Sequence, residues 1–66
     1  MKITINGESK DFSEKTTLEA LLKKLKLEGK VMAAAVNMEI IKKDNWDKYI
    51  LVDGDKLELL DFVGGG

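Results

Sequence analysis

The C-terminal glycines are the residues of this chain whose chemistry is easiest to define. Gly64, Gly65 and Gly66 end the sequence, and the α-carboxylate of Gly66 is ionised at neutral pH, which makes it a poor electrophile. Conversion to an acyl-phosphate anhydride with ATP would supply a good leaving group. Glycine lacks a Cβ, so such a segment can thread a narrow cleft on another protein. The competing interpretation is an inert, frayed terminus or a linker.

The side chains on which most enzymes depend are missing. The chain of 66 residues contains no Cys and no His, and all 11 of its basic residues are Lys. This composition excludes zinc sites built on thiolate or imidazole, disulfides and histidine-assisted nucleophiles. Acid–base catalysis would depend on Asp, Glu, Lys or Tyr49, and the chain has few residues with which to enclose a pocket. We therefore expect a carrier or binding module, not an enzyme, with no metal and no cofactor of its own.

The remaining candidate side chains favour structural roles. Asp53, Asp55 and Glu58 lack the spacing of an EF-hand loop, and Asp-Gly-Asp is a common turn. Trp46 and Tyr49 are expected to pack, because no basic cluster surrounds them. Lys42 and Lys43 are interpreted as a solvated turn, and a basic pair there would also suit docking to an acidic partner.

Charge and hydropathy exclude two classes of partner. The formal net charge is -1 and the pI is about 5.3, which does not predict a nucleic-acid surface. The longest apolar run, Val31 to Val36, is far shorter than the ~20 residues of a membrane helix. The residues after Lys2 alternate and form no signal-peptide core. We expect a cytoplasmic protein that binds neither nucleic acid nor membrane.

The elements that must position the C-terminal residues begin with a hairpin and a helix. Ile3 and Ile5 alternate with polar residues, Asn6-Gly7 indicates a tight turn, and residues 8–12 return as a strand that buries Phe12. A helix then carries four leucines on one face, at positions 18, 21, 22 and 25. We expect a capping box of Thr16 and Glu19 at its start. Gly29 is expected to end the helix or the turn after it.

The second half of the chain reads as strands. We expect a buried strand over 32–37, a brief strand at Ile40-Ile41, a helical or 3₁₀ turn over 43–47 that presents Trp46 inward, a turn at 53–55 and a last strand over 56–63. This order predicts an α+β fold of the β-grasp type, a roll with a mixed sheet of four to five strands packed on one main helix. Residues 1–63 would form a single domain, and residues 64–66 a flexible tail.

The last strand has two faces of different character. Leu57 and Leu59 fall on the core face, whereas Leu60 and Phe62 share the other face with Glu58. Ordinary surface exposure is one interpretation of the two outer apolar residues. A docking patch beside the C-terminus is the other, because clustered exposed apolar area on a small protein usually marks an interface.

Taken together, these segments resemble a known family. The segments concerned are 3–7 (Ile-Thr-Ile-Asn-Gly), 17–18 and 21–22 in the helix, 35–37 with 40–41, Trp46, 53–55 and 62–66 (Phe-Val-Gly-Gly-Gly). The chain resembles the ThiS family, ubiquitin-like β-grasp sulfur carriers of thiamin thiazole biosynthesis. It departs from the family at Lys42-Lys43, where Pro-Arg is frequent.

The resemblance implies partners and site residues. A ThiF-like adenylating enzyme would activate the carboxylate of Gly66 with ATP, and a cysteine-desulfurase relay would supply sulfur to form a thiocarboxylate. A ThiG-like thiazole synthase would then take that sulfur. Gly65 and Gly66 would form the reactive end, and the partner-facing residues would be Leu60, Phe62, Val63 and Gly64. Two alternatives stay open: the small subunit of molybdopterin synthase, and a non-catalytic β-grasp interaction module.

Overall fold

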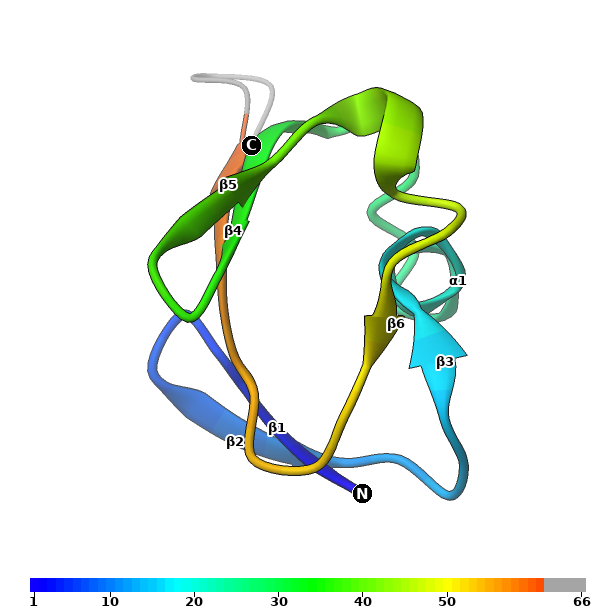
Figure 1. The fold of residues 1–66 in the computed structure, drawn as a ribbon, viewed down its shortest axis with the longest axis vertical. Helices are drawn as coiled ribbons and strands as arrows, with labels where there is room; N and C mark the ends of the chain where they lie inside the picture. The colour runs from blue at the N-terminus through cyan, green and yellow to red at the C-terminus, as the bar shows by residue number, and fades with distance from the viewer. Residues whose placement is uncertain (62–66) are drawn as a thin grey trace.

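A mixed five-stranded sheet forms the framework of the molecule. The computed structural model describes the backbone of residues 1–61 and the side chains of residues 1–60 (Figure 1). The strands follow the spatial order β2-β1-β7-β4-β5. Their bounds are β1 (Lys2–Ile5), β2 (Glu8–Asp11), β4 (Val31–Val36), β5 (Glu39–Ile41) and β7 (Lys56–Asp61). β1 and β7 are parallel, and the other neighbours are antiparallel. The predicted mixed sheet is confirmed.

Two hairpins flank the central strand β7. In the first, Asn6 and Gly7 have φ of 48° and 88°, the left-handed turn that Asn-Gly predicts. In the second, Asn37 and Met38 adopt φ of 51° and 70° and join β4 to β5. The tips of the two hairpins lie at the same end of the sheet in Figure 1. Phe12 follows β2 and is partly buried against the core, as expected.

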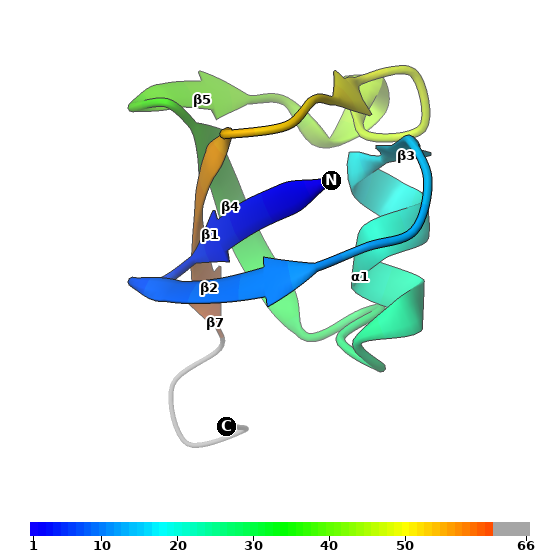
Figure 2. The same ribbon diagram turned by 90° about the horizontal axis from the view of Figure 1, so that it is seen from below.

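One helix, α1 (Leu18–Lys24), covers one face of the sheet (Figure 2). The predicted apolar face is confirmed, since Leu18, Leu21 and Leu22 are buried. The predicted capping box is wrong. The N-cap is Thr17, whose side chain accepts a hydrogen bond from the backbone N–H of Ala20 at 3.1 Å. Thr16 is held in an extended segment, and its hydroxyl donates to the carbonyl oxygen of Thr17 at 3.3 Å.

A second, two-stranded sheet was not predicted from the sequence. β3 (Thr16–Thr17) and β6 (Ile50–Leu51) pair antiparallel at the start of the helix. Leu51 is fully buried, whereas its neighbour Ile50 is 57% exposed. This small sheet therefore adds one core residue and fixes the start of α1 against the second half of the chain.

The predicted 3₁₀ turn is present as η1 (Lys43–Asn45). Trp46 follows it, is partly buried against the core and donates from Nε1 to the carbonyl oxygen of Ile41 at 2.8 Å. Lys43 Nζ lies 5.7 Å from the centroid of its ring. Tyr49 also packs against the core. Both aromatic residues thus have the packing role that the sequence predicts.

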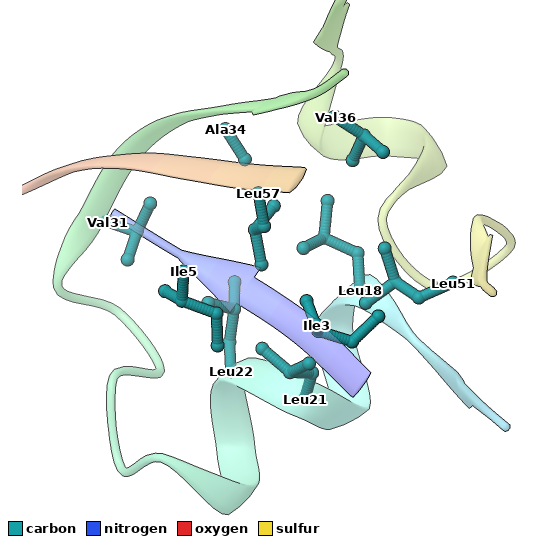
Figure 3. Packing of buried hydrophobic residues seen from close by; sticks show 10 residues of the cluster. All are labelled: Ile3, Ile5, Leu18, Leu21, Leu22, Val31, Ala34, Val36, Leu51 and Leu57. Carbon is teal, nitrogen blue, oxygen red and sulfur yellow. The ribbon is translucent and has the colours of Figure 1, made fainter. Parts of the chain in front are cut away.

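The core lies between the inner face of the five-stranded sheet and α1 (Figure 3). Its buried members are Ile3, Ile5, Leu18, Leu21, Leu22, Val31, Ala34, Val36, Leu51 and Leu57. β1 contributes the alternate residues Ile3 and Ile5, as a period-two pattern requires, and β7 contributes Leu57 with Leu59 partly buried beside it. In β4 the alternation holds for Ala34 and Val36. Within residues 1–61, no helix is long and apolar enough to span a membrane.

The predicted last strand is confirmed as far as β7 reaches, which is Asp61. The predicted boundary between residues 63 and 64, and the flexible tail expected after it, lie outside the described residues. β7 ends five positions before Gly66 in the sequence. The middle strand of the sheet is thus the last described element before the C-terminal glycines.

Candidate functional site: an apolar groove beside the last strand

The outer face of the sheet, opposite α1, carries a groove built by alanines between larger residues. β4 lies between β7 and β5, so Ala35 is opposite Glu58 on one side and Ile40 on the other. Ala33 is opposite Leu60 one step further along. Because alanine side chains are short, the middle of this face is hollow, and the groove has a volume of about 410 Å³.

The walls of the groove are exposed apolar side chains. Ile40 is 74% exposed and Leu60 is 58% exposed. Asn6 also lines the groove, at the end near the first hairpin. Among the lining residues that the structure describes, Glu58 carries the only charge. The groove therefore suits an apolar partner surface that brings a cation to Glu58.

A β-bulge enlarges the apolar surface where the start of β4 meets the end of β7. The register of β4 on β7 shifts between Val31 and Ala33, so Met32 is the extra residue beside Leu60. Val31 remains buried while Met32 is 46% exposed. Without the bulge, strict alternation would not allow Val31 and Ala34 to face the core together. Met32 and Leu60 thus form an exposed apolar pair at this end of the sheet.

The central strand β7 is held by two turn asparagines. Asn6 Oδ1 accepts a hydrogen bond from the backbone N–H of Leu59 at 2.8 Å, and Asn37 Oδ1 accepts one from the N–H of Lys56 at 3.0 Å. Each is the first residue of a two-residue hairpin turn. Sequence reasoning identified Asn6 as a turn residue but missed this second role. The signal in the sequence was an Asn at the first turn position, because its carboxamide can hydrogen-bond to a neighbouring strand.

The acidic residues considered for metal binding do not form a site. Among the described residues, no group of three or more His, Cys, Asp or Glu side chains is placed to hold a metal ion. Asp55 is 7% exposed, and its carboxylate accepts from Asn37 Nδ2 and from the N–H of Val52. Asp53 accepts from the N–H of Lys2 at 2.6 Å. Both aspartates therefore hold turns, the structural role expected for Asp-Gly-Asp.

The predicted site residues are only partly within the described chain. Leu60 lies on the outer face, as its position in the alternation predicts, and Leu57 and Leu59 face the core. Lys42 and Lys43 are exposed, as expected for a solvated turn. The other predicted site residues lie outside the described residues: Phe62, Val63, Gly64, Gly65 and Gly66. Their proposed roles stay predictions.

A mixed sheet whose first and last strands are parallel neighbours, with one helix on one face, defines a β-grasp protein of the ubiquitin-like class. The model of the ThiS family matches residues 3–66. The chain belongs to the ThiS family. Both the fold and the family that the sequence pattern predicted are thereby confirmed.

Known relatives agree with this assignment. The crystal structure of the thiamine biosynthesis protein ThiS from Geobacter metallireducens superposes with a TM-score of 0.83 at 31% identity, covering 100% of both chains. The sulfur carrier protein ThiS of Bacillus subtilis (strain 168) is 35% identical over 65 residues, 97% of this chain and 98% of its own length. A thiazole synthase of Paramagnetospirillum magneticum is 44% identical over 66 residues. The chain spans only 20% of the length of that synthase.

Proposed function

We propose that this chain carries sulfur for the formation of the thiazole of thiamin, on the terminal carboxylate of Gly66. Membership of the ThiS family, with a full-length match to a sulfur carrier protein, is the observation that carries the proposal. The composition agrees with it, because a reactive C-terminal carboxylate needs neither Cys nor His in the same chain. The chain itself would be a carrier and not an enzyme, acting in the cytoplasm with no bound cofactor.

Activation would take place on a ThiF-like adenylating enzyme. A carboxylate oxygen of Gly66 attacks the α-phosphorus of ATP, and pyrophosphate leaves to give an acyl adenylate. A sulfur nucleophile from a cysteine-desulfurase relay then attacks the acyl carbon, and AMP leaves. Where the sulfur arrives as a persulfide, a thiol releases the donor cysteine as a mixed disulfide, and the chain retains a thiocarboxylate. Gly65 and Gly66 lack side chains that would obstruct a narrow active site.

Docking would use the outer-face groove. Leu60 and Ile40 provide exposed apolar area, and Glu58 supplies one negative charge. The groove lies beside β7, the strand that leads to Gly66. We extend the docking surface to Phe62, Val63 and Gly64, which follow directly in the sequence. A partner that binds here lies beside the strand after which the sequence continues to the residue to be activated.

The consumer of the sulfur would be a ThiG-like thiazole synthase. One supporting observation is that a protein named thiazole synthase contains a segment 44% identical to the whole of this chain. Sequences that act together are often joined in one polypeptide, because the tether raises the effective concentration of one for the other.

The test is a reconstituted reaction followed by intact mass. The chain is incubated with ATP, the adenylating enzyme of the same organism and a cysteine desulfurase with cysteine. The expected product has one sulfur in place of one oxygen, and it transfers that sulfur to thiazole synthase. A variant lacking residues 65 and 66 is the control and should stay unmodified. An unmodified full-length chain beside an active enzyme, or equal modification of the deletion variant, would refute the carrier function. Transfer to the large subunit of molybdopterin synthase instead would assign the chain to that pathway.

A further inference from the structure

The turn between β1 and β2 holds the central strand through one residue, Asn6, which uses both its side chain and its backbone. Asn6 Oδ1 accepts the backbone N–H of Leu59 at 2.8 Å, across 53 positions of sequence. The backbone N–H of Asn6 donates to the carbonyl oxygen of Leu57 at 2.9 Å. One residue therefore bonds to Leu57 and Leu59, two alternate residues of β7 that lie on the same face of the strand.

The Asn6 side chain takes the place of a strand partner for β7, because β1 ends before β7 does. The parallel register of β1 on β7 comprises Thr4 with Lys56 and Ile5 with Leu57, and β1 ends there. On the β1 side, no strand of the described part of the chain lies beside the last residues of β7. The Asn6 carboxamide thus continues the hydrogen-bond ladder by one step. Among the residues that the structure describes, it is the last contact of this ladder, and Gly66 follows seven positions beyond Leu59 in the sequence.

Asn6 also lies at the groove. Its atoms line the hollow together with Leu59, Leu60 and the alanines of β4. A partner seated there would touch the residue that holds the end of β7. The direction of β7 relative to the docking surface is set on one side by Asn6 and on the other side by the pairing with β4, which extends to Asp61.

We propose that Asn6 is a positioning residue for the adenylation of Gly66, an inference that rests on the proposed function. The carboxylate must be placed in line with the α-phosphorus of ATP, and small errors of placement greatly lower the rate of such reactions. Docking in the groove fixes the sheet, and the Asn6–Leu59 hydrogen bond transmits that position to the end of β7. Loss of this bond leaves the last residues of β7 held by β4 alone, so that they separate from the sheet more often.

The chain contains a matched control for this residue. Asn37 also has a left-handed backbone, and its Oδ1 also accepts from a β7 amide, that of Lys56 at 3.0 Å. Lys56 begins β7, whereas Leu59 lies near its end. Asn6→Gly and Asn37→Gly both leave the left-handed turn accessible, and they remove side-chain hydrogen bonds at opposite ends of the same strand. Asn37→Gly removes two such bonds, to Lys56 and to Asp55, and is therefore the more demanding control.

The experiment measures adenylation by ATP–pyrophosphate exchange with the adenylating enzyme of the same organism, varying the concentration of the carrier. We expect Asn6→Gly to lower kcat about tenfold with KM nearly unchanged. Asn6→Asp keeps an acceptor and should retain kcat within about twofold. Asn37→Gly should retain kcat at temperatures where circular dichroism shows it folded.

A second variant removes the donor in place of the acceptor. The 66-residue chain is made by chemical synthesis with an ester in place of the Leu59 amide, which leaves Asn6 and its turn intact. The ester should lower kcat as much as Asn6→Gly does, and the two changes together should cost no more than either alone. An unchanged kcat in the folded ester variant, or equal losses in Asn6→Gly and Asn37→Gly, would overturn the inference. If the wild-type chain is not adenylated at all, the proposed function fails instead.

Discussion

Asn37 and Asp55 join two turns that lie 18 positions apart, because Asn37 Nδ2 donates to Asp55 Oδ1 at 3.0 Å. The other carboxylate oxygen, Oδ2, accepts from the N–H of Val52 at 2.9 Å. Asp55 is 7% exposed, so its replacement leaves these donors without partners in a nearly buried position. We expect Asp55→Ala to lower the free energy of unfolding by about 2–4 kcal/mol, measured by urea denaturation. The exposed Asp47→Ala should change it by no more than about 0.5 kcal/mol. Equal effects would contradict the structural role of Asp55.

The two residues of β6 should differ sharply in their contribution to stability. Leu51 is fully buried and Ile50 is 57% exposed, although they are adjacent in the sequence. Truncation of a buried leucine loses transfer free energy and leaves a cavity, so Leu51→Ala should cost about 2–5 kcal/mol. Ile50→Ala should lower the free energy of unfolding by less than about 1 kcal/mol, because the Ile50 side chain buries little apolar area. Thermal unfolding followed by circular dichroism measures both, and a larger cost at Ile50 would show that the face of β6 is wrongly assigned.

Leu60 and Ile50 form a matched pair for testing the groove. They are 58% and 57% exposed, but only Leu60 lines the groove. Leu60→Asp places a charge against the apolar surface of the partner, and we expect affinity for the adenylating enzyme to fall at least about tenfold, by ~1.4 kcal/mol or more. Ile50→Asp should bind as the wild type does. Isothermal titration calorimetry measures both, and unchanged binding of folded Leu60→Asp would exclude the groove as the docking surface.

The two hairpin tips should respond in opposite ways to exchange of their second residue. Met38 is 93% exposed at φ of 70°, whereas Gly7 occupies the equivalent position at φ of 88°. Met38→Gly should raise the free energy of unfolding by about 0.5–1 kcal/mol, because left-handed backbone strains a residue with a Cβ. Gly7→Ala should lower it by about 1 kcal/mol through the backbone alone, since a Cβ there meets nothing within 4 Å. Chemical denaturation gives both values, and destabilisation by Met38→Gly would mean that the methionine side chain stabilises the fold.

Local signals were sufficient for most of the fold. Alternation predicted β1, a short run of small apolar residues predicted β4, Asn-Gly predicted the first hairpin, and the leucine spacing predicted α1. Each of these patterns involves neighbouring residues, so it can be recognised in a single sequence. The exposure of Leu60 followed from the same alternation.

The features that were missed depend on distant partners. The first amides of α1 are satisfied partly from the second half of the chain, with Leu18 donating to the Tyr49 carbonyl and Glu19 to that of Trp46. Pairing with Leu51 holds Thr16 in β3, and Thr17 becomes the cap. β3 and β6 contain two residues each, too few to show a period. The hydrogen bond between Asn6 and Leu59 cannot be predicted from a local pattern either.

The parallel pairing of β1 with β7 also has a mechanical consequence. When a partner pulls on the C-terminal residues while the N-terminal end is held, the force runs along both strands in opposite senses. The rungs at Thr4–Lys56 and Ile5–Leu57 are then loaded in shear and must yield together. An antiparallel hairpin pulled from its open end would instead unzip one rung at a time. The parallel pairing of the first and last strands therefore makes the folded domain resistant to unfolding by force applied at the C-terminal residues.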